Sequence, residues 1–353
     1  MNKAKKFRLP AEWEPQSGVQ LTWPDESTPW FELPKVQLCY ARIAEAVQAF
    51  EPLMVVSADV EAARARLLNI VRSEGLSLDL DAIAFHECPV NDTWARDHGG
   101  IAVLGRGGEK YLYDFVFNGW GLKFASDLDN QITRTIFFDG AFAPEVSCVD
   151  MRPFVLEGGS IDSDGKGTLM TTVRCLTSVN RNEYLEREEI EGELKSAFGL
   201  ERVIWLENGE IEGDDTDGHV DIMARFAPDD TIVYVKCDDP SAAEYASLKA
   251  MEEELKALRT LDGKPYRLLQ LPLPGKTYLE GYPLPASYAN FLVVNGGVLV
   301  PGCGSPLDEE AALVVAEAFP GREVRIVDCS ALLSGHGGLH CVTMNFPEGY
   351  LRK

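Results

Sequence analysis

Residues 290–328 read NFLVVNGGVLVPGCGSPLDEEAALVVAEAFPGREVRIVD, in which two apolar runs flank Asn295-Gly296-Gly297. Asn-Gly between such runs is typical of a β-hairpin turn. The next segment, 307–319, places its apolar residues at helical spacing, and 324–328 is again a β-rich run. The stretch therefore predicts a hairpin, a helix and a further strand, which together form one α/β unit.

The same alternation continues along the whole chain. A second hairpin signal is Asp162-Ser163-Asp164-Gly165, and HVDIMARF (219–226) is expected to be a strand. Helical spacing also occurs in four other segments: 36–50, 58–75, 182–199 and 241–259. No linker, charge block or low-complexity stretch divides the 353 residues. We therefore expect a single domain over residues 1–353, built from one repeated α/β unit.

Polar clusters recur at a nearly constant interval. They are centred on Asp97, Glu157, His219 and Cys341, with separations of 60, 62 and 122 residues, the last being close to twice the others. One reactive group per repeat is what a closed ring needs to bring its side chains together on the axis, and radial repetition also protects strand edges. The spacing thus favours a ring of five or six units.

The formal net charge of −23 makes a nucleic-acid-binding surface improbable, because such surfaces need clustered Lys and Arg. The charge is compatible with attracting a cationic small molecule, and equally with simple solubility. The sequence contains no run of about 20 apolar residues, so it predicts no membrane span. The basic start, MNKAKKF, lacks the apolar stretch of a secretory signal. We expect a cytoplasmic protein, and the sequence leaves a homo-oligomer open.

Metals and cofactors are not expected. The eight cysteines form no C-x-x-C pair, which indicates neither a zinc site nor a disulfide framework. GDDTDGH and SIDSDGKGTLMT resemble calcium loops, but in both the first and last ligand positions hold unsuitable residues. No H-E-x-x-H motif is present.

His219 stands in DDTDGHVD, where four aspartates surround it. If the segment after Gly218 is a strand, His219 and Asp221 project to the same face. A histidine and a carboxylate presented together can move a proton and bind a cation. The alternative is that these acids form a solvated loop that caps a strand.

NDTWARDHGG (91–100) places Asp97 close to Trp94. An aromatic face beside a carboxylate suits a flat, delocalised cation such as guanidinium. A buried ion pair between Arg96 and one of the acids is the structural alternative, and both can hold together. Glu157 in LEGGS precedes two glycines, which either let the backbone approach a neighbour closely or simply form a turn.

Cys341 is the strongest candidate for a nucleophile. Gly335, Gly337 and Gly338 leave space on the approach to it, and LHCVTM (339–344) is expected to be a strand that holds the thiol rigidly. A cysteine is a good nucleophile near neutral pH because a little thiolate is always present. The accompanying acids argue against a cysteine protease, since carboxylates would repel an oxyanion. They suit a cationic electrophile, the carbon of an amidine or guanidinium group.

Several motifs in order along the chain resemble those of the agmatine deiminase family, which includes the Porphyromonas-type peptidylarginine deiminases. They are WARDHGG, FNGWG (117–121), VLEGGS, TSVNRN (177–182), TDGHVD, FLVVNGGVLVP and a glycine run that ends in HC. The resemblance extends from residue 8 to Cys341. It implies the fold of the guanidine-modifying (pentein) superfamily, a five-bladed α/β propeller with pseudo-fivefold symmetry, which agrees with the spacing of about 60 residues.

The resemblance also implies roles for these residues. Cys341 is the nucleophile that forms an amidino-cysteine intermediate, and His219 is the general acid and base. Asp97 and Asp221 bind the guanidinium nitrogens, while Glu157 orients His219 and helps to hold the substrate. Asp215, four residues before His219, stands where many members of the family also have an acid. Trp94 joins the substrate-binding set from the aromatic-face argument above.

Some positions depart from the family pattern. His336 and Leu339 replace a Gly and the Asn of G-G-G-N-I-H-C, while RDHGG and FNGWGL replace RD-x-GP and FNAWGG. None of these changes touches the implied catalytic set. They leave open which amine-bearing tail the pocket accepts.

The resemblance implies an agmatine deiminase, which hydrolyses agmatine to N-carbamoylputrescine and ammonia in polyamine (putrescine) biosynthesis. Deimination of peptidyl or free arginine is the alternative, and a non-catalytic propeller that binds cationic amines is a remote one. Free arginine would need an Arg or Lys near the pocket mouth, and a peptide would need an open cleft. The acids around Cys341 disfavour its thiolate, so we expect a bound cation to lower the pKa of the thiol.

Overall fold

The stretch 290–328 folds as predicted in the computed structural model, which describes residues 7–352. An antiparallel hairpin is followed by a helix and by a strand that pairs in parallel with the second hairpin strand. Gly296 adopts a positive φ of 74° in the turn, a conformation that favours glycine. The elements are β16 (Leu292–Val294), β17 (Gly297–Gly302), α9 (Asp308–Ala318) and β18 (Glu323–Asp328).

The same order of elements occurs in four further sheets of the described chain. The first has β5 (Ile101–Gly105), β6 (Lys110–Val116), α5 (Ile132–Phe138) and β7 (Val146–Val155). The second has β8 (Asp162–Ser163), β9 (Thr168–Thr172), α7 (Arg187–Phe198) and β10 (Arg202–Leu206). The third has β11 (Ala224–Ala227), β12 (Thr231–Lys236), α8 (Tyr245–Ala257) and β13 (Arg267–Pro272). These units confirm the predicted repetition.

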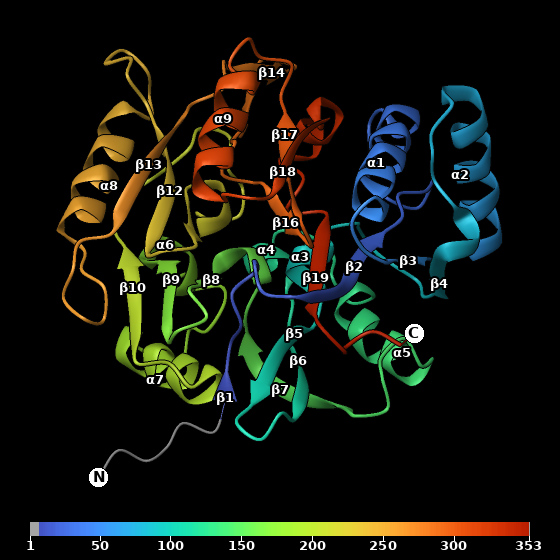
Figure 1. Cartoon of the computed structure of the whole chain (residues 1–353), viewed down its shortest axis with the longest axis horizontal. Helices are drawn as coiled ribbons and strands as arrows, with labels where there is room; N and C mark the ends of the chain where they lie inside the picture. The colour runs from blue at the N-terminus through green and yellow to red at the C-terminus, as the bar shows by residue number, and fades with distance from the viewer. Residues whose placement is uncertain (1–6, 353) are drawn as a thin grey trace.

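The remaining sheet joins the two ends of the described chain. It contains β19 (Thr343–Pro347), β2 (Gln16–Thr22), α1 (Leu33–Gln48) and β3 (Leu53–Ser57), to which α2 (Val60–Glu74) and β4 (Ile83–Glu87) are added. β19 pairs antiparallel with β2, with Thr343 opposite Leu21. Figure 1 shows β19 beside β2 near the middle of the molecule, with the longer helices of all five units toward the outside.

Smaller elements complete the described chain. β1 (Phe7–Arg8) adds to the edge of β5, and β14 (Thr277–Leu279) pairs with β15 (Tyr282–Leu284). The short helices are α3 (Ala95–His98), α4 (Gly119–Leu122) and α6 (Val173–Leu176). Single 3-10 turns are η1 (Leu80–Ala82), η2 (Asp129–Gln131), η3 (Gly158–Ser160), η4 (Val220–Ile222) and η5 (Ser330–Gly335). No helix in the described range is long and apolar enough to cross a membrane.

Local sequence signals explain where the helices begin and end. The Asp59 side chain caps α2 by accepting from Ala62 N at 2.9 Å, an interaction that contributes about 1 kcal/mol. Gly75 ends the helix with a positive φ of 69°. α2 buries Ala63, Leu67 and Ile70, one face of the helix, so its amphipathic pattern positions it against the sheet.

Two expected strands are wrong at the places that matter for function. His219 precedes the single turn η4, and β11 begins only at Ala224. Gly218 has a positive φ of 92°, which turns the chain before His219. Cys341 lies in a turn closed by Thr343 N donating to His340 O at 3.0 Å, and β19 begins at Thr343. Cys341 therefore lies two residues before a strand, and His219 lies five residues before another.

Candidate active site

The Cys341 thiol lies at a cavity of about 260 Å³. Cys341 is 6% exposed, and its own backbone carbonyl accepts a hydrogen bond from Arg96 N at 3.1 Å. Gly335 and Gly337 line the same cavity. A Cβ at Gly337 would overlap the Trp94 ring. The glycines thus leave room for an aromatic wall as well as for a ligand.

Asn290 holds the thiol from one side. Its Nδ2 donates to Cys341 Sγ at 3.2 Å, and its Oδ1 lies 3.4 Å from the same sulfur. Asn290 Oδ1 also accepts from His340 N at 2.9 Å. A Cβ at Gly338 would come within 2.5 Å of this oxygen, so the close approach requires glycine there. The amide therefore fixes the turn that carries the thiol.

Burial is the largest cause that raises the pKa of the Cys341 thiol well above its ordinary value. The Asp221 and Asp97 carboxylates raise it further, because negative charge opposes formation of a thiolate, while bonds from Gly338 and Asn290 oppose part of this rise. Asp221 Oδ2 lies 3.9 Å from Sγ. These effects favour the thiol over the thiolate at Cys341.

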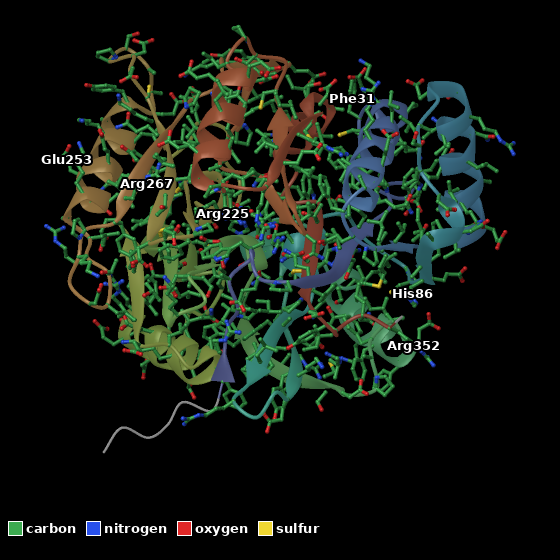
Figure 2. The ribbon with its side chains drawn as sticks, viewed as in Figure 1. Phe31, His86, Arg225, Glu253, Arg267 and Arg352 are labelled. Atoms are coloured by element: carbon green, nitrogen blue, oxygen red, sulfur yellow. The ribbon has the colours of Figure 1, made fainter. Side chains whose placement is uncertain are left out.

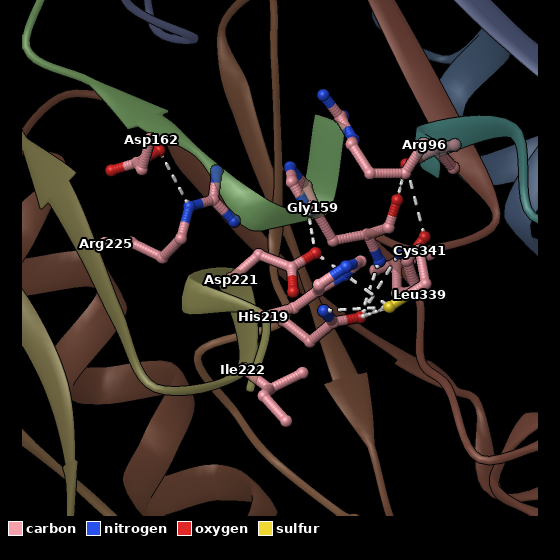
Figure 3. A network of polar contacts seen from close by, with 12 residues as sticks. Arg96, Gly159, Asp162, His219, Asp221, Ile222, Arg225, Leu339 and Cys341 are labelled. Carbon is pink, nitrogen blue, oxygen red and sulfur yellow. Dashed lines mark hydrogen bonds and ion pairs between the residues drawn. The ribbon is translucent and has the colours of Figure 1, made fainter. Parts of the chain in front are cut away.

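Three side chains converge on Gly159. A Cβ there would lie 2.6 Å from His219 Nδ1, 2.8 Å from Asp97 Oδ1 and 3.2 Å from Asp221 Oδ2. Gly159 N donates to Asp97 Oδ1 at 3.1 Å. Both interpretations of LEGGS are confirmed, since the two glycines after Glu157 lie in the turn η3 and also allow a close backbone approach. Figure 3 shows His219, Asp221 and Cys341 together, with Arg225 and Asp162 on the other side of Asp221 in this view.

His219 and Asp97 form a buried pair. His219 Nδ1 lies 3.6 Å from Asp97 Oδ1. Burial lowers the pKa of His219, but the Asp97 carboxylate, with Cys175 and Glu157, raises it to about 10. Burial in turn raises the pKa of Asp97 to about 6, despite the opposing effect of His219. At neutral pH the histidine is a cation and the aspartate an anion.

Asp97 is also oriented by an aromatic donor. Trp120 Nε1 donates to Asp97 Oδ2 at 2.9 Å. The rings of Trp30, Trp94 and Trp120 follow one another, with centroids 5.2 Å and 6.4 Å apart, and all three line the cavity. The cavity therefore combines an apolar wall with a carboxylate.

Glu157 is fully buried behind His219. Arg181 Nε donates to both its carboxylate oxygens, at 3.0 Å and 3.1 Å. A carboxylate oxygen of Glu157, Cys175 Sγ and a ring nitrogen of His219 lie within 4.8 Å of one another, a combination that could hold a metal ion. Because Arg181 already binds Glu157, this carboxylate is committed to an ion pair.

Some buried polar atoms in the site lack a well-formed hydrogen bond. Within residues 7–352 these include both ring nitrogens of His219 and Oδ1 of Asp221. His219 and Asp221 do not themselves line the cavity, but they lie next to Asp97 and Cys341, which do. Because buried polar groups are normally satisfied, their unpaired atoms indicate a place for a ligand.

A model of the Porphyromonas-type peptidyl-arginine deiminase family matches residues 8–347. The chain belongs to this family. An agmatine deiminase from Pseudomonas fluorescens is 34% identical over 368 residues, covering 98% of this chain and 96% of that protein.

Two solved structures are also similar. A candidate arginine deiminase from Porphyromonas gingivalis is 48% identical, with a TM-score of 0.90, and the match covers 98% of this chain and 100% of that one. A substrate-bound Cys→Ser variant of agmatine deiminase from C. jejuni is 35% identical, with a TM-score of 0.86, over 98% and 97% of the two chains. The chain has the α/β fold of these deiminases.

In this member of the peptidyl-arginine deiminase family, the residues singled out from the sequence lie together. Those that line the cavity are Trp94, Asp97, Asp215 and Cys341. His219 and Asp221 meet Asp97 at Gly159, and Glu157 lies beside His219. His336 lines the cavity, whereas Leu339 is fully buried in the core. Sequence reasoning missed four partners: Trp120, Arg181, Asn290 and His340.

Proposed function

We propose that the protein is an agmatine deiminase, which hydrolyses the guanidinium group of agmatine to give N-carbamoylputrescine and ammonia. Membership of the deiminase family and the similarity to agmatine deiminases support this reaction. The observation that carries the choice of substrate is the charge of the cavity wall. Asp92, Asp97 and Asp215 line it, and no Lys or Arg of the described chain does.

The charge of the wall matches a substrate with two cationic ends. Agmatine carries a guanidinium and an ammonium group and has no carboxylate. Free arginine would bring a carboxylate close to three acids without a cation to bind it. Lys123, which contacts the Asp215 backbone, is already paired, since it also donates to Asp217 Oδ1 at 2.7 Å. The three tryptophans supply an apolar wall for the methylene chain.

The guanidinium docks between Asp97 and Asp221. The unpaired Asp221 Oδ1 accepts one N–H group, and Asp97 accepts from another nitrogen, through charge-assisted hydrogen bonds. Trp94 lies against the cation, and Asp215 pairs with the ammonium end. Burial raises the pKa of Asp215 to about 6 although His336 opposes the rise, so a cation beside it would favour its ionised form.

The bound cation then favours loss of the Cys341 proton to solvent, and the thiolate attacks the central carbon. His219, already an imidazolium at neutral pH, gives a proton to one nitrogen, and the C–N bond breaks with release of ammonia. An amidino-cysteine remains. Neutral His219 next takes a proton from water, which attacks the same carbon. The C–S bond breaks, the hydroxyl proton restores the thiol, and the ureido product leaves.

Glu157 acts through His219. Its carboxylate lies on the side of the imidazole shared with Cys175, so it holds the ring and favours its protonated form. Arg181 fixes Glu157 in turn. In our proposal this pair orients the general acid, and Glu157 also helps to hold the substrate.

The architecture that supports this site is proposed to be a single-domain, five-bladed propeller over residues 1–353. The five repeated hairpin–helix–strand units and the sheet shared by both ends of the described chain support it. A cytoplasmic location is supported by eight cysteines that are all free.

Ammonia release from agmatine, L-arginine and a blocked arginine peptide tests the function. We expect turnover of agmatine alone, abolished in Cys341→Ser and retained in the control Cys148→Ser, a half-buried cysteine on β7. Release of ammonia from the blocked peptide instead would mean that the same chemistry serves to modify arginine residues in proteins. Binding of agmatine without release from any substrate would identify a non-catalytic protein.

A further inference from the structure

His340 is a buried histidine that the proposed mechanism does not use. It is 2% exposed, and its ring lies between two carboxylates. Nδ1 is 2.7 Å from Asp221 Oδ2, and Nε2 is 2.8 Å from Glu12 Oε2. An ionised carboxylate only accepts hydrogen bonds, so each contact needs a proton on the ring nitrogen. With both acids ionised, the ring is an imidazolium.

The charges around Glu12 keep it ionised. Arg225 Nη2 donates to Oε2 at 2.7 Å, and Val293 N donates to Oε1 at 2.8 Å. Arg96 Nη2 lies 3.9 Å from Oε2. Burial raises the pKa of Glu12, but Arg225 and His340 lower it below its ordinary value. Arg225 lies close to the centre of the molecule in Figure 2.

Asp221 divides its two oxygens between different neighbours. Oδ2 faces His340 at 2.7 Å and the Cys341 thiol at 3.9 Å, whereas Oδ1 has no hydrogen-bond partner in the described chain. Burial raises the pKa of Asp221, but the hydrogen bond and charge of His340, with His219 and Arg225, lower it. The orientation and the charge of this carboxylate thus depend on His340.

We propose that His340 is a positioning residue, an imidazolium anchored on Glu12 that keeps Asp221 ionised and turns its Oδ1 toward the substrate guanidinium. The proposal rests on the proposed function, because it assigns Asp221 to guanidinium binding. Glu12 comes from the segment between β1 and β2. In this proposal the segment acts on the substrate indirectly, because Glu12 holds His340 and His340 holds Asp221. Asn290 holds the backbone of the same histidine, with Oδ1 accepting from His340 N at 2.9 Å.

The first test is the pH dependence of kcat/KM for agmatine in His340→Gln. Without the imidazolium, burial raises the pKa of Asp221. Asp221 is then protonated more readily at acid pH, and the protonated form binds the guanidinium less well. We expect a greater loss of kcat/KM at pH 6 than at pH 8.5, because protonation of Asp221 removes the charge that binds the guanidinium. The control His86→Gln, whose histidine pairs with the exposed Asp139, should retain the wild-type profile.

The second test asks whether His340 acts through Asp221. In a double-mutant cycle, we compare the factor by which His340→Gln lowers kcat/KM in two backgrounds. This factor should be at least about tenfold smaller in Asp221→Asn than in wild type. Equal losses in both backgrounds would overturn the proposal, because a merely structural histidine acts independently of the Asp221 charge. A pH profile for His340→Gln parallel to that of wild type would also overturn it.

The third test does not depend on turnover or on a folded His340 variant. In ¹⁵N-histidine-labelled wild-type protein, we expect both ring nitrogens of His340 to have imidazolium shifts at pH 8. In Glu12→Gln, which keeps the side-chain shape, the Nε2 signal should shift, because the amide no longer presents a carboxylate to that nitrogen. A neutral His340 in wild type at pH 8 would overturn the proposal. If the wild-type protein does not turn over agmatine but His340 is an imidazolium, only the proposed function is overturned.

Discussion

Replacing Asp221 by Asn should make the Cys341 thiol much more acidic. Asp221 Oδ2 lies 3.9 Å from Sγ, so its charge disfavours the thiolate by about 4 kcal/mol at an effective dielectric constant of about 20. That free energy corresponds to about 3 in the pKa. The His340 ring, 2.7 Å from the same oxygen, screens part of this charge, so we expect a fall of at least about 1 in the pKa of the thiol.

The rate of alkylation of Cys341 by iodoacetamide between pH 7 and 10.5, followed by mass spectrometry of the Cys341 peptide, measures this change. In wild type the logarithm of the rate should rise with pH across the range, because the pKa of the thiol is well above its ordinary value. In Asp221→Asn the rate should reach a plateau at lower pH. The control Asp139→Asn removes an exposed acid on the outer surface. An unchanged profile in folded Asp221→Asn would refute the electrostatic argument.

Three further variants test other parts of the site. Asp215→Asn should raise KM for agmatine about tenfold, through loss of a charge-assisted hydrogen bond, and leave KM for butylguanidine, which lacks the ammonium group, unchanged. Trp120→Phe removes a donor that lowers the pKa of Asp97, so that pKa should rise above about 6. Because Asp97 acts ionised, the acid limb of kcat/KM should move up by about 1 pH unit. Gly159→Ala should reduce kcat about 100-fold, because its Cβ would displace the His219 ring.

One control variant and one contradicting outcome for each substitution complete these tests. Gly192→Ala lies on α7, where an added Cβ meets no atom within 4 Å, and should leave activity intact. A fall in KM for both guanidines in Asp215→Asn would contradict the role of that acid. An unshifted acid limb in Trp120→Phe would show that Asp97 does not control it. A fully active Gly159→Ala protein would show that the site tolerates a displacement of His219.

The repeated α/β unit could be predicted from the sequence because its signals are local. The Asn295-Gly296 turn, the apolar runs beside it and the helical spacing of 307–319 are all contained in one stretch, and the structure has each element there. The regular spacing of Asp97, Glu157, His219 and Cys341 also indicated convergence. Three of these side chains line the cavity or meet at Gly159, and Glu157 lies directly behind His219.

The partners of these residues could not be predicted, because they come from remote parts of the chain. Glu12 and His340 are 328 residues apart, and no periodic pattern relates them. Trp120 and Asn290 stand in motifs that were recognised for other reasons, but their contacts with Asp97 and Cys341 depend on how the sheets pack. The one signal for His340 was its place beside Cys341 in a chain with five histidines.

Pairing of β19 with β2 makes the position of the Cys341 thiol depend on a contact between distant parts of the chain. Cys341 lies two residues before Thr343, which pairs with Leu21. The thiol is therefore displaced when this strand pairing is lost. Fraying of β19 would withdraw the sulfur from Asn290 and Asp221 while the other four units kept their own sheets. Under mild denaturation, inactivation should therefore precede the loss of most secondary structure, as local opening requires less free energy than global unfolding.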